Sequence, residues 1–326
     1  MYKDKLIFIY WIIQKNQELF ALCFCLCNIP CDDLIFSVGN MILNGKEIAA
    51  KIKLDLTKKV QKVFPDKKNY VWIIYLWDNK SSATYVRMKK KFGEEIWLKT
   101  EIFGQEKKYE QIENVVSLIH DLNDDKNCLW FLIQLPLPSQ FEPHRAELLS
   151  LIAPDKDIDW LWWVLTWLSG IWLIDFVPAT ARAVVTLLKE YNLYNLKWKV
   201  ITVIWQSNLS WKPLVNEFIK QWASVFSCNE YTDKILIKDY CLKSDYIISC
   251  TWCIHLLDDT FVRDDQSQVL VDVWYGYLNG KPAGDVDFQK VKDKVKYISP
   301  VPGGVWPLTV ASIFENLFTI EDWLDK

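Results

Sequence analysis

Apolar residues after position 41 follow two different spacings, and each spacing predicts a different kind of element. From Ile48 to Val60 they stand four residues apart, which places them on one face of a helix over residues 46–64. Residues 71–76 form a short continuous apolar run instead, which is typical of a parallel strand buried on both faces. The regular part of the chain therefore opens with a helix followed by a strand.

The same alternation continues to the end of the chain. Because strands that alternate with helices join through right-handed crossovers into a covered parallel sheet, the pattern predicts an α/β fold. A length of 326 residues is enough for two domains with separate cores. Further helices are predicted over residues 81–92, 110–122, 180–191, 214–221 and 308–318, and further strands over residues 129–135, 199–204, 224–227, 246–249 and 269–273.

The first 40 residues do not share this pattern. Residues 6–13 and 19–27 are apolar, but each run is shorter than the roughly 18–20 residues that span a bilayer. Lys15 and Glu18 interrupt the apolar region, and no small-residue cleavage site follows, so a secretory signal is not predicted. We expect residues 1–40 to be an extension outside the fold.

Charge and cysteine content exclude several classes of protein. Charged residues make up 24% of the chain and the net charge is −3, which gives no reason to expect nucleic acid as a partner. The spacing of the cysteines between Cys23 and Cys31 fits no zinc site, so no metal is expected. The remaining cysteines are scattered, which indicates free thiols in a reducing, cytoplasmic compartment.

A loop rich in proline and glycine precedes the last predicted helix. Residues 300–307 contain three prolines and two glycines, which excludes a helix interior or a central strand. Such a rigid loop leaves backbone N–H groups free to meet a ligand, and Pro307 suits the first turn of the following helix. An ordinary proline-rich connection would have the same features, so the loop alone leaves both interpretations open.

Residues 300–309 resemble the PVPGGVGPMT signature of bifunctional methylenetetrahydrofolate dehydrogenase/cyclohydrolases. The resemblance implies two βαβ domains. Residues 41–177 with 303–326 would form a folate-binding catalytic domain, and residues 178–302 a Rossmann-type NAD(P)-binding domain, with the last helix returning to the first. Further matches lie, in chain order, at residues 42–49, 84–89, 134–138, 154–159 and 284–288.

The resemblance assigns the catalytic residues. Tyr85 and Lys89 are four apart, so they project from one helix face; a solvated pair beside Lys90 would have the same spacing. In the family this spacing carries the catalytic lysine, which corresponds to Lys89, and Tyr85 would stack on the folate. A lysine acts as a base only if its pKa is lowered. Gln134, its family partner, can bond the amine without stabilising the ammonium as a carboxylate would.

A second group of residues is implied to bind the substrate. Asp159 could simply cap the segment that follows it, but the matching acid of the family accepts hydrogen bonds from the pterin, as suits an ionised acceptor. Pro302, Gly303, Gly304 and Thr309 would line the same cleft.

The resemblance implies two reactions in one cleft. 5,10-Methylenetetrahydrofolate would be oxidised to the methenyl form, and Lys89 would then help water convert this to 10-formyltetrahydrofolate, a one-carbon donor for purine biosynthesis. The family is usually a homodimer, and no membrane is expected as a partner. A homologue with only the cyclohydrolase activity, an inactive homologue, and a membrane-associated structural protein are the alternatives.

The predicted phosphate loop and the residues near it bear on the choice between NAD and NADP. Residues 205–213 read W-x-S-x-x-x-W-x-P where the family has glycine at both tryptophans, and Ser207 with the loop amides would hold the pyrophosphate. NADP is the family default, but Gln206 stands where arginine is common. Glu230 follows the second strand of this domain, where an acid takes the ribose hydroxyls of NAD. Trp205, Trp211, Thr251 and Asp272 complete the predicted cofactor site.

Composition adds an anomaly, because the chain has 10 glycines and 18 tryptophans. Glycine normally makes up about 7% of a protein, so the two counts together would be an ordinary glycine content. We hypothesise that the gene reads UGA as glycine; an inactive, decayed homologue is the competing hypothesis, but decay would not spare the polar catalytic positions. Against the family pattern, tryptophan occupies glycine positions at Trp77, Trp97, Trp130, Trp160, Trp167, Trp198, Trp205, Trp211, Trp222, Trp252, Trp274 and Trp306.

Overall fold

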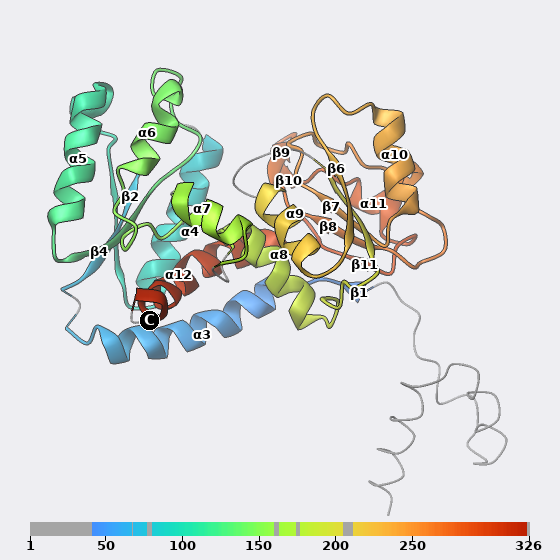
Figure 1. Cartoon of the computed structure of the whole chain (residues 1–326), viewed down its shortest axis with the longest axis horizontal. Coiled ribbons are helices and arrows are strands. Elements are labelled where there is room, and N and C mark those ends of the chain that lie inside the picture. The colour runs from blue at the N-terminus through green and yellow to red at the C-terminus, as the bar shows by residue number, and fades with distance from the viewer. Residues whose placement is uncertain are drawn as a thin grey trace, which may run out of the picture. The chain divides into compact units, whose positions relative to one another are not determined.

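The computed structural model describes residues 41–66, 68–76, 80–159, 163–173, 177–204 and 211–324 (Figure 1). The chain divides into two units, residues 1–39 and 40–326, and the described residues all belong to the second. The predicted extension therefore lies outside the described residues. Within the described part, no helix combines the length and the apolar character needed to cross a membrane.

A three-stranded parallel sheet forms the first half of the described unit. It consists of β2 (Tyr70–Ile74), β3 (Lys99–Phe103) and β4 (Cys128–Ile133). Strand β2 is central and pairs in parallel with both neighbours. Its residues Val71, Ile73 and Ile74 are buried as the continuous apolar run predicts, whereas Tyr70 and Trp72 are half-buried. The helices of this half are α3 (Gly45–Val63), α4 (Lys80–Glu95), η3 (Lys107–Glu110), α5 (Ile112–Asp124), η4 (Glu142–His144), α6 (Arg145–Ser150) and α7 (Trp163–Gly170).

A six-stranded parallel sheet forms the second half. Its strands, in spatial order, are β1 (Met41–Ile42), β11 (Tyr297–Ile298), β8 (Val269–Asp272), β7 (Tyr246–Ser249), β5 (Val200–Ile204) and β6 (Ser224–Cys228). Strand β1 thus joins the second sheet. The sequence analysis instead assigned all of residues 41–177 to the first domain. The other elements here are α8 (Ala179–Glu190), α9 (Trp211–Lys220), α10 (Lys234–Lys243), η5 (Asp259–Phe261), the antiparallel pair β9 (Gly276–Leu278) and β10 (Lys281–Ala283), and α11 (Phe288–Val291).

The predicted α/β fold is confirmed. Strands β2, β4, β5, β6, β7 and β8 begin and end within two residues of the predicted bounds. Strand β3 was not predicted, because it lies at the sheet edge and carries the charged side chains of Lys99 and Glu101 in place of an apolar run. Helix α10 was also missed, since its lysines and aspartate interrupt the apolar spacing.

Helix α12 (Val305–Leu324) packs into the cores of both halves. Leu308 and Ala311 are buried in the core that includes residues of β5 and β7, whereas Val310 and Phe314 are buried in the core that includes residues of β2 and β4. The helix contacts α3, α4 and α8, beside which it lies in Figure 1. One helix therefore fixes the loop before it against the elements of both sheets.

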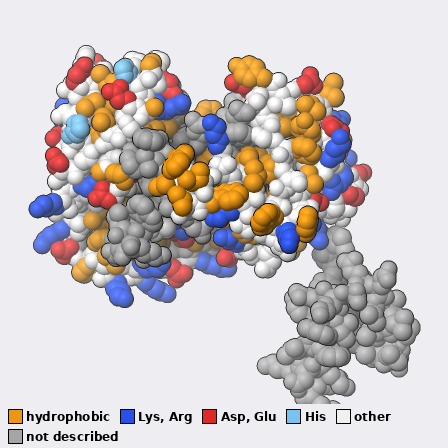
Figure 2. Space-filling model, viewed as in Figure 1, with side chains coloured by type: hydrophobic (Ala, Val, Ile, Leu, Met, Phe, Trp, Pro, Cys, Tyr) orange, Lys and Arg blue, Asp and Glu red, His pale blue; other side chains and the backbone are white. Residues whose placement is uncertain are grey.

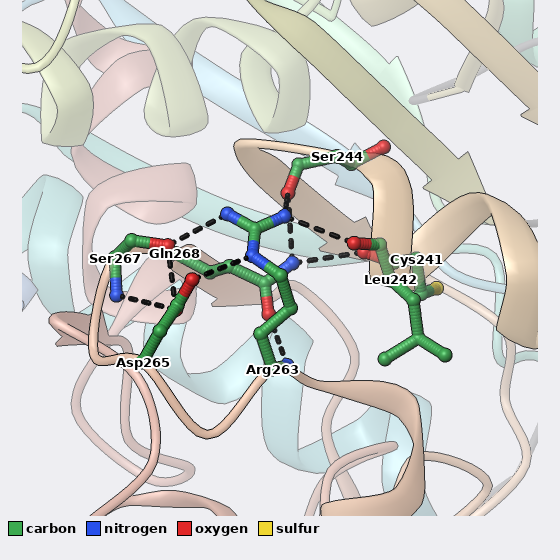
Figure 3. A network of polar contacts seen from close by, with 7 residues as sticks. All are labelled: Cys241, Leu242, Ser244, Arg263, Asp265, Ser267 and Gln268. Atoms are coloured by element: carbon green, nitrogen blue, oxygen red, sulfur yellow. Dashed lines mark hydrogen bonds and ion pairs between the residues drawn. The ribbon is translucent and has the colours of Figure 1, made fainter.

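A buried amide closes the end of α10 (Figure 3). The Gln268 side chain is fully buried; its Nε2 donates to the carbonyls of Cys241 at 2.8 Å and Ser244 at 2.7 Å, and its Oε1 accepts from Arg263 N at 2.7 Å. The Arg263 guanidinium donates to the carbonyls of Leu242 and Ser244. Because the last carbonyls of a helix have no intrahelical partners, this network supplies partners to the end of α10, and the Cys241 carbonyl also accepts from the Ser244 N–H at 3.2 Å.

Replacing Gln268 with methionine is expected to destabilise the fold. The substitution keeps the side-chain length but removes the acceptor of the Arg263 N–H and one of the two donors to each carbonyl, at a cost of about 1–3 kcal/mol in the free energy of unfolding. Chemical denaturation of Gln268→Met measures this cost. Gln289→Met, at an exposed helical position, is the matched control. Equal denaturation midpoints for the two variants would contradict the role of the network.

Candidate active site

Three of the predicted site residues come together around one amine. Lys89 lies on α4 and only 2% of it is exposed. Its Nζ is 3.6 Å from Oδ2 of Asp159 and 4.5 Å from the ring centroid of Tyr85. The four-residue spacing on the helix thus places the Tyr85 ring beside the amine, as a cation–π pair requires.

Burial decides the protonation of this amine. Removal from water lowers the pKa of Lys89 below its ordinary value, while the charge of Asp159 and its hydrogen bond act in the opposite direction. The net direction is downward, so a larger fraction of Lys89 is neutral than for a surface lysine. Burial, with the Asp159 charge second, raises the pKa of Tyr85, which keeps its hydroxyl protonated.

Gln134 presents an acceptor with no partner. It follows directly after β4, is 7% exposed, and its backbone N–H donates to the carbonyl of Ile74 at 2.8 Å. Its Nε2 donates to the carbonyl of Leu135 at 2.6 Å, whereas its Oε1 is buried and has no hydrogen-bond partner among the described residues. A buried unpaired amide oxygen is costly, which is typical of a position that a ligand or water fills.

The proline-glycine loop is fixed to the start of α3. The Lys46 N–H donates to the carbonyl of Gly303 at 3.2 Å, and a Cβ on Gly45 would lie 1.8 Å from the carbonyl oxygen of Gly304. Only glycine at position 45 permits this approach. Gly303 has a φ of +116°, a left-handed conformation that favours glycine. The loop conformation therefore requires glycine at two positions, 45 and 303.

Three other residues of the loop region differ in their exposure and contacts. Pro302 is exposed, whereas Thr309 is buried on α12 and its hydroxyl donates to the carbonyl of Val305 at 3.3 Å. The ring of Trp306 meets the Tyr85 ring edge-on, with 4.5 Å between centroids, and also lies against Tyr275 at 5.1 Å. An indole thus covers part of the tyrosine on which the folate is expected to stack.

On the cofactor side, Glu230 is exposed directly after β6. The Oδ1 of Asn229 accepts from the backbone N–H of Tyr231 at 2.9 Å, which shapes this turn. Trp205, Gln206 and Ser207 lie outside the described residues, and so does the side chain of Trp211.

Thr251 and Asp272 are buried beside a second acid that the sequence analysis did not assign. Oδ2 of Asp285 accepts from the Thr251 N–H at 2.5 Å and from the Ser249 hydroxyl at 2.8 Å, and Oδ2 of Asp272 accepts from the Val286 N–H at 3.0 Å. Burial raises the pKa of both carboxyl groups, and for Asp272 the charge of Asp285 adds to it. The acid pair thus links the segment around residues 285–286 to the carboxyl ends of β7 and β8.

Two family models match the two halves of the chain. The catalytic domain of tetrahydrofolate dehydrogenase/cyclohydrolase matches residues 43–159, and the NAD(P)-binding domain of the same enzymes matches residues 178–323. The chain belongs to the tetrahydrofolate dehydrogenase/cyclohydrolase family.

Relatives in this family match along nearly their whole length. The bifunctional protein FolD of Mesoplasma florum is 34% identical over 284 residues, which cover 86% of this chain and 96% of that protein. The crystal structure of FolD from Campylobacter jejuni is 32% identical, with a TM-score of 0.78, and covers 88% of this chain and all of that one. The Trypanosoma brucei enzyme, solved with NADP and an inhibitor, is 25% identical, has a TM-score of 0.79, and covers 88% of this chain and 99% of its own.

Membership in the tetrahydrofolate dehydrogenase/cyclohydrolase family confirms the function inferred from the motifs. The chain is an enzyme of folate one-carbon metabolism with oxidoreductase and hydrolase activities, and it uses a nicotinamide nucleotide. The sequence analysis did not assign Gly45, Asp285 or the contact of Trp306 with Tyr85. Gly45 and Asp285 lie within segments that carry the resemblance, but their roles depend on contacts between segments far apart in the chain.

Removing the Asp159 charge should move the pH dependence of hydrolysis in a defined direction. Because Asp159 raises the pKa of Lys89, Asp159→Asn should lower that pKa further. A base is active when neutral, so the acidic limb of kcat against pH should move to lower pH, by roughly one to three units. The profile is measured at saturating methenyltetrahydrofolate.

The matched control for this shift is Glu94→Gln, an exposed acid on the same helix that pairs with Lys90. Its acidic limb should stay where it is in the parent enzyme. An Asp159→Asn limb that stays in place, or that moves to higher pH, would show that Lys89 does not act as the base.

Proposed function

We propose that Lys89 is the base for the hydrolytic half of the reaction and that both reactions occur in one site. The observation that carries this is a buried amine held between Asp159 and the ring of Tyr85. Tyr85 would stack on the folate, and Asp159 would accept hydrogen bonds from the pterin. Pro302, Gly303, Gly304 and Thr309 would line the same site.

In the hydrolytic step, neutral Lys89 accepts a proton from water as the water oxygen bonds to the methenyl carbon. The bond from that carbon to N5 then breaks as N5 takes a proton, and the new hydroxyl loses its proton to solvent, so that the carbon remains on N10 as a formyl group. The unpaired Oε1 of Gln134 is an acceptor for an N–H of Lys89 or for the water. Because this oxygen carries no full charge, it orients the amine without favouring the ammonium form.

The preceding oxidation requires a bound nicotinamide, which accepts a hydride from the methylene carbon. The nucleotide would lie at the carboxyl ends of β5 and β7. In the order β8-β7-β5-β6, the chain adds β6 on one side of β5 and then β7 on the other side, so the topological switch point lies between β5 and β7. Residues 205–210 connect β5 to the start of α9, where backbone N–H groups suit a pyrophosphate. The connection contains Trp205, Gln206 and Ser207, and Trp211 begins α9. Thr251 follows β7, and Asp272 ends β8.

Glu230 is proposed to select NAD over NADP. Its exposed carboxylate follows β6, the second strand of this domain, where an acid can accept hydrogen bonds from the ribose hydroxyls and would repel a 2′-phosphate. Glu230→Ser should lower the ratio of kcat/KM for NAD to kcat/KM for NADP by about tenfold, or 1.4 kcal/mol. Asp239→Ser, at a half-buried acid on α10 that pairs with Lys243, is the control. A parent enzyme that strongly prefers NADP would contradict the assignment.

The two activities are tested directly on purified protein. Both the printed chain and a chain with glycine at the twelve tryptophan positions named in the sequence analysis are supplied with methylenetetrahydrofolate and NAD or NADP. Formation of the reduced nucleotide reports oxidation, and loss of the methenyl absorbance reports hydrolysis.

Lys89→Met should lower hydrolysis by at least about 100-fold, whereas Lys91→Met, on the exposed face of α4, should not. Hydrolysis without oxidation in both chains would identify a cyclohydrolase only, and neither activity in either chain would contradict the proposal.

We also propose that the enzyme is a cytoplasmic homodimer. Strand β6 ends the six-stranded sheet, so one of its edges carries no strand among the described residues and can pair with a second copy. Light scattering of the purified chain should give twice the mass of one chain. A mass equal to one chain would contradict the dimer.

A further inference from the structure

Four helices end with the same pair of backbone hydrogen bonds. At the end of α4, Leu98 N–H donates to the carbonyl of Gly93 at 2.9 Å and Trp97 N–H donates to that of Glu94 at 3.1 Å. In this Schellman arrangement the residue just past the helix takes a left-handed backbone conformation, and glycine or sometimes asparagine occupies it. The same pair of bonds ends α7, α8 and α9, and the four left-handed residues are Trp97 (φ 74°), Trp172 (φ 63°), Asn192 (φ 57°) and Trp222 (φ 63°).

A β-turn before β5 has the same feature. Lys199 N–H donates to the carbonyl of Leu196 at 3.0 Å, and Trp198, the third residue of this turn, has a φ of 66°. A turn with positive φ at this position alone is of type II, which requires glycine or asparagine there. Trp252, next to Thr251, has a φ of 65°.

Tryptophan is the commonest residue among the described positions with positive φ. Nine described residues other than glycine have positive φ; five are tryptophan, and the others are Asn192, His255, Gln266 and Asn279. Asparagine and histidine are enriched in this conformation, whereas in tryptophan the Cβ lies too close to the backbone carbonyl oxygen, at a cost of about 1–2 kcal/mol.

None of the five indoles is buried in a core, and all are about half exposed or more. Figure 2 shows hydrophobic side chains at the surface on one face of the molecule. By contrast, Trp72 in β2 has ordinary strand surroundings, with its ring 4.6 Å from that of Phe103 and 5.3 Å from that of Tyr70. The exposed fractions of the five are 49% for Trp97, 52% for Trp172, 85% for Trp198, 77% for Trp222 and 61% for Trp252.

We propose that the protein made in its own cell carries glycine at positions 97, 172, 198, 222 and 252, and that a UGA codon is read as glycine at each of them. The backbone argument is independent of the proposed function and of the family pattern. It covers four of the twelve positions selected from the family pattern and adds Trp172, which that pattern did not select.

The same codon assignment has a functional consequence. With glycine at 205 and 211, the phosphate loop becomes G-x-S-x-x-x-G-x-P, which lets a pyrophosphate approach the backbone. With glycine at 306, the indole that covers the Tyr85 ring is gone. This consequence rests on the proposed function, whereas the identity of the five turn residues does not.

Mass spectrometry of the protein isolated from its own organism, with the gene sequence, tests the proposal. The expected result is glycine in the peptides that span positions 97, 172, 198, 222 and 252, with UGA at each codon. Tryptophan in these peptides would overturn the proposal. Because this measurement requires no activity, it fails or succeeds separately from the enzyme assays.

Stability measurements test the backbone argument on the printed chain. At Trp97, Trp198 and Trp222, the glycine variant should unfold at a higher temperature than the alanine variant, because only glycine has no Cβ to strain. At Trp72, the order should be reversed, because glycine weakens a strand interior. If the alanine variants were the more stable at Trp97, Trp198 and Trp222 as well, the assignment would be wrong. Comparing two variants of the same position removes the effect of losing the indole.

Discussion

The active site depends on one primary amine that is held out of water beside a single carboxylate. Burial favours the neutral form of Lys89, and the nearby charge of Asp159 limits how far the pKa falls. The pKa of Lys89 is lowered overall because burial is the larger of the two effects. Tyr85 contributes a ring and no formal charge to the surroundings of the amine, since burial keeps its hydroxyl protonated.

The fold brings the parts of this site together through α12. This helix is buried in the cores of both sheets, and the loop before it meets the start of α3 at a distance that only glycine allows. The loop therefore lies at a fixed position relative to α4, which carries the lysine. The strand order of the second sheet places its switch point between β5 and β7, where α/β folds bind nucleotides.

Residues with strong local patterns could be predicted from the sequence, and residues that act through distant contacts could not. The buried strands are continuous apolar runs, so β2 and β4 were found, whereas the charged edge strand β3 was not. Lys89 and Tyr85 were found from their spacing and the family motif. The roles of Gly45 and Asp285 were missed because each depends on a neighbour far away in the chain. The left-handed tryptophans at helix ends likewise required backbone angles.

The most direct test of this account is the titration of Lys89 itself. In protein labelled with ¹³C at the lysine Cε atoms, NMR follows each amine as pH rises, and assignment uses Lys89→Met, which lacks the signal. The account predicts that one lysine signal titrates at lower pH than the signals of the other lysines, and that this signal is absent from the variant. A Lys89 signal that titrates together with the surface lysines would contradict it.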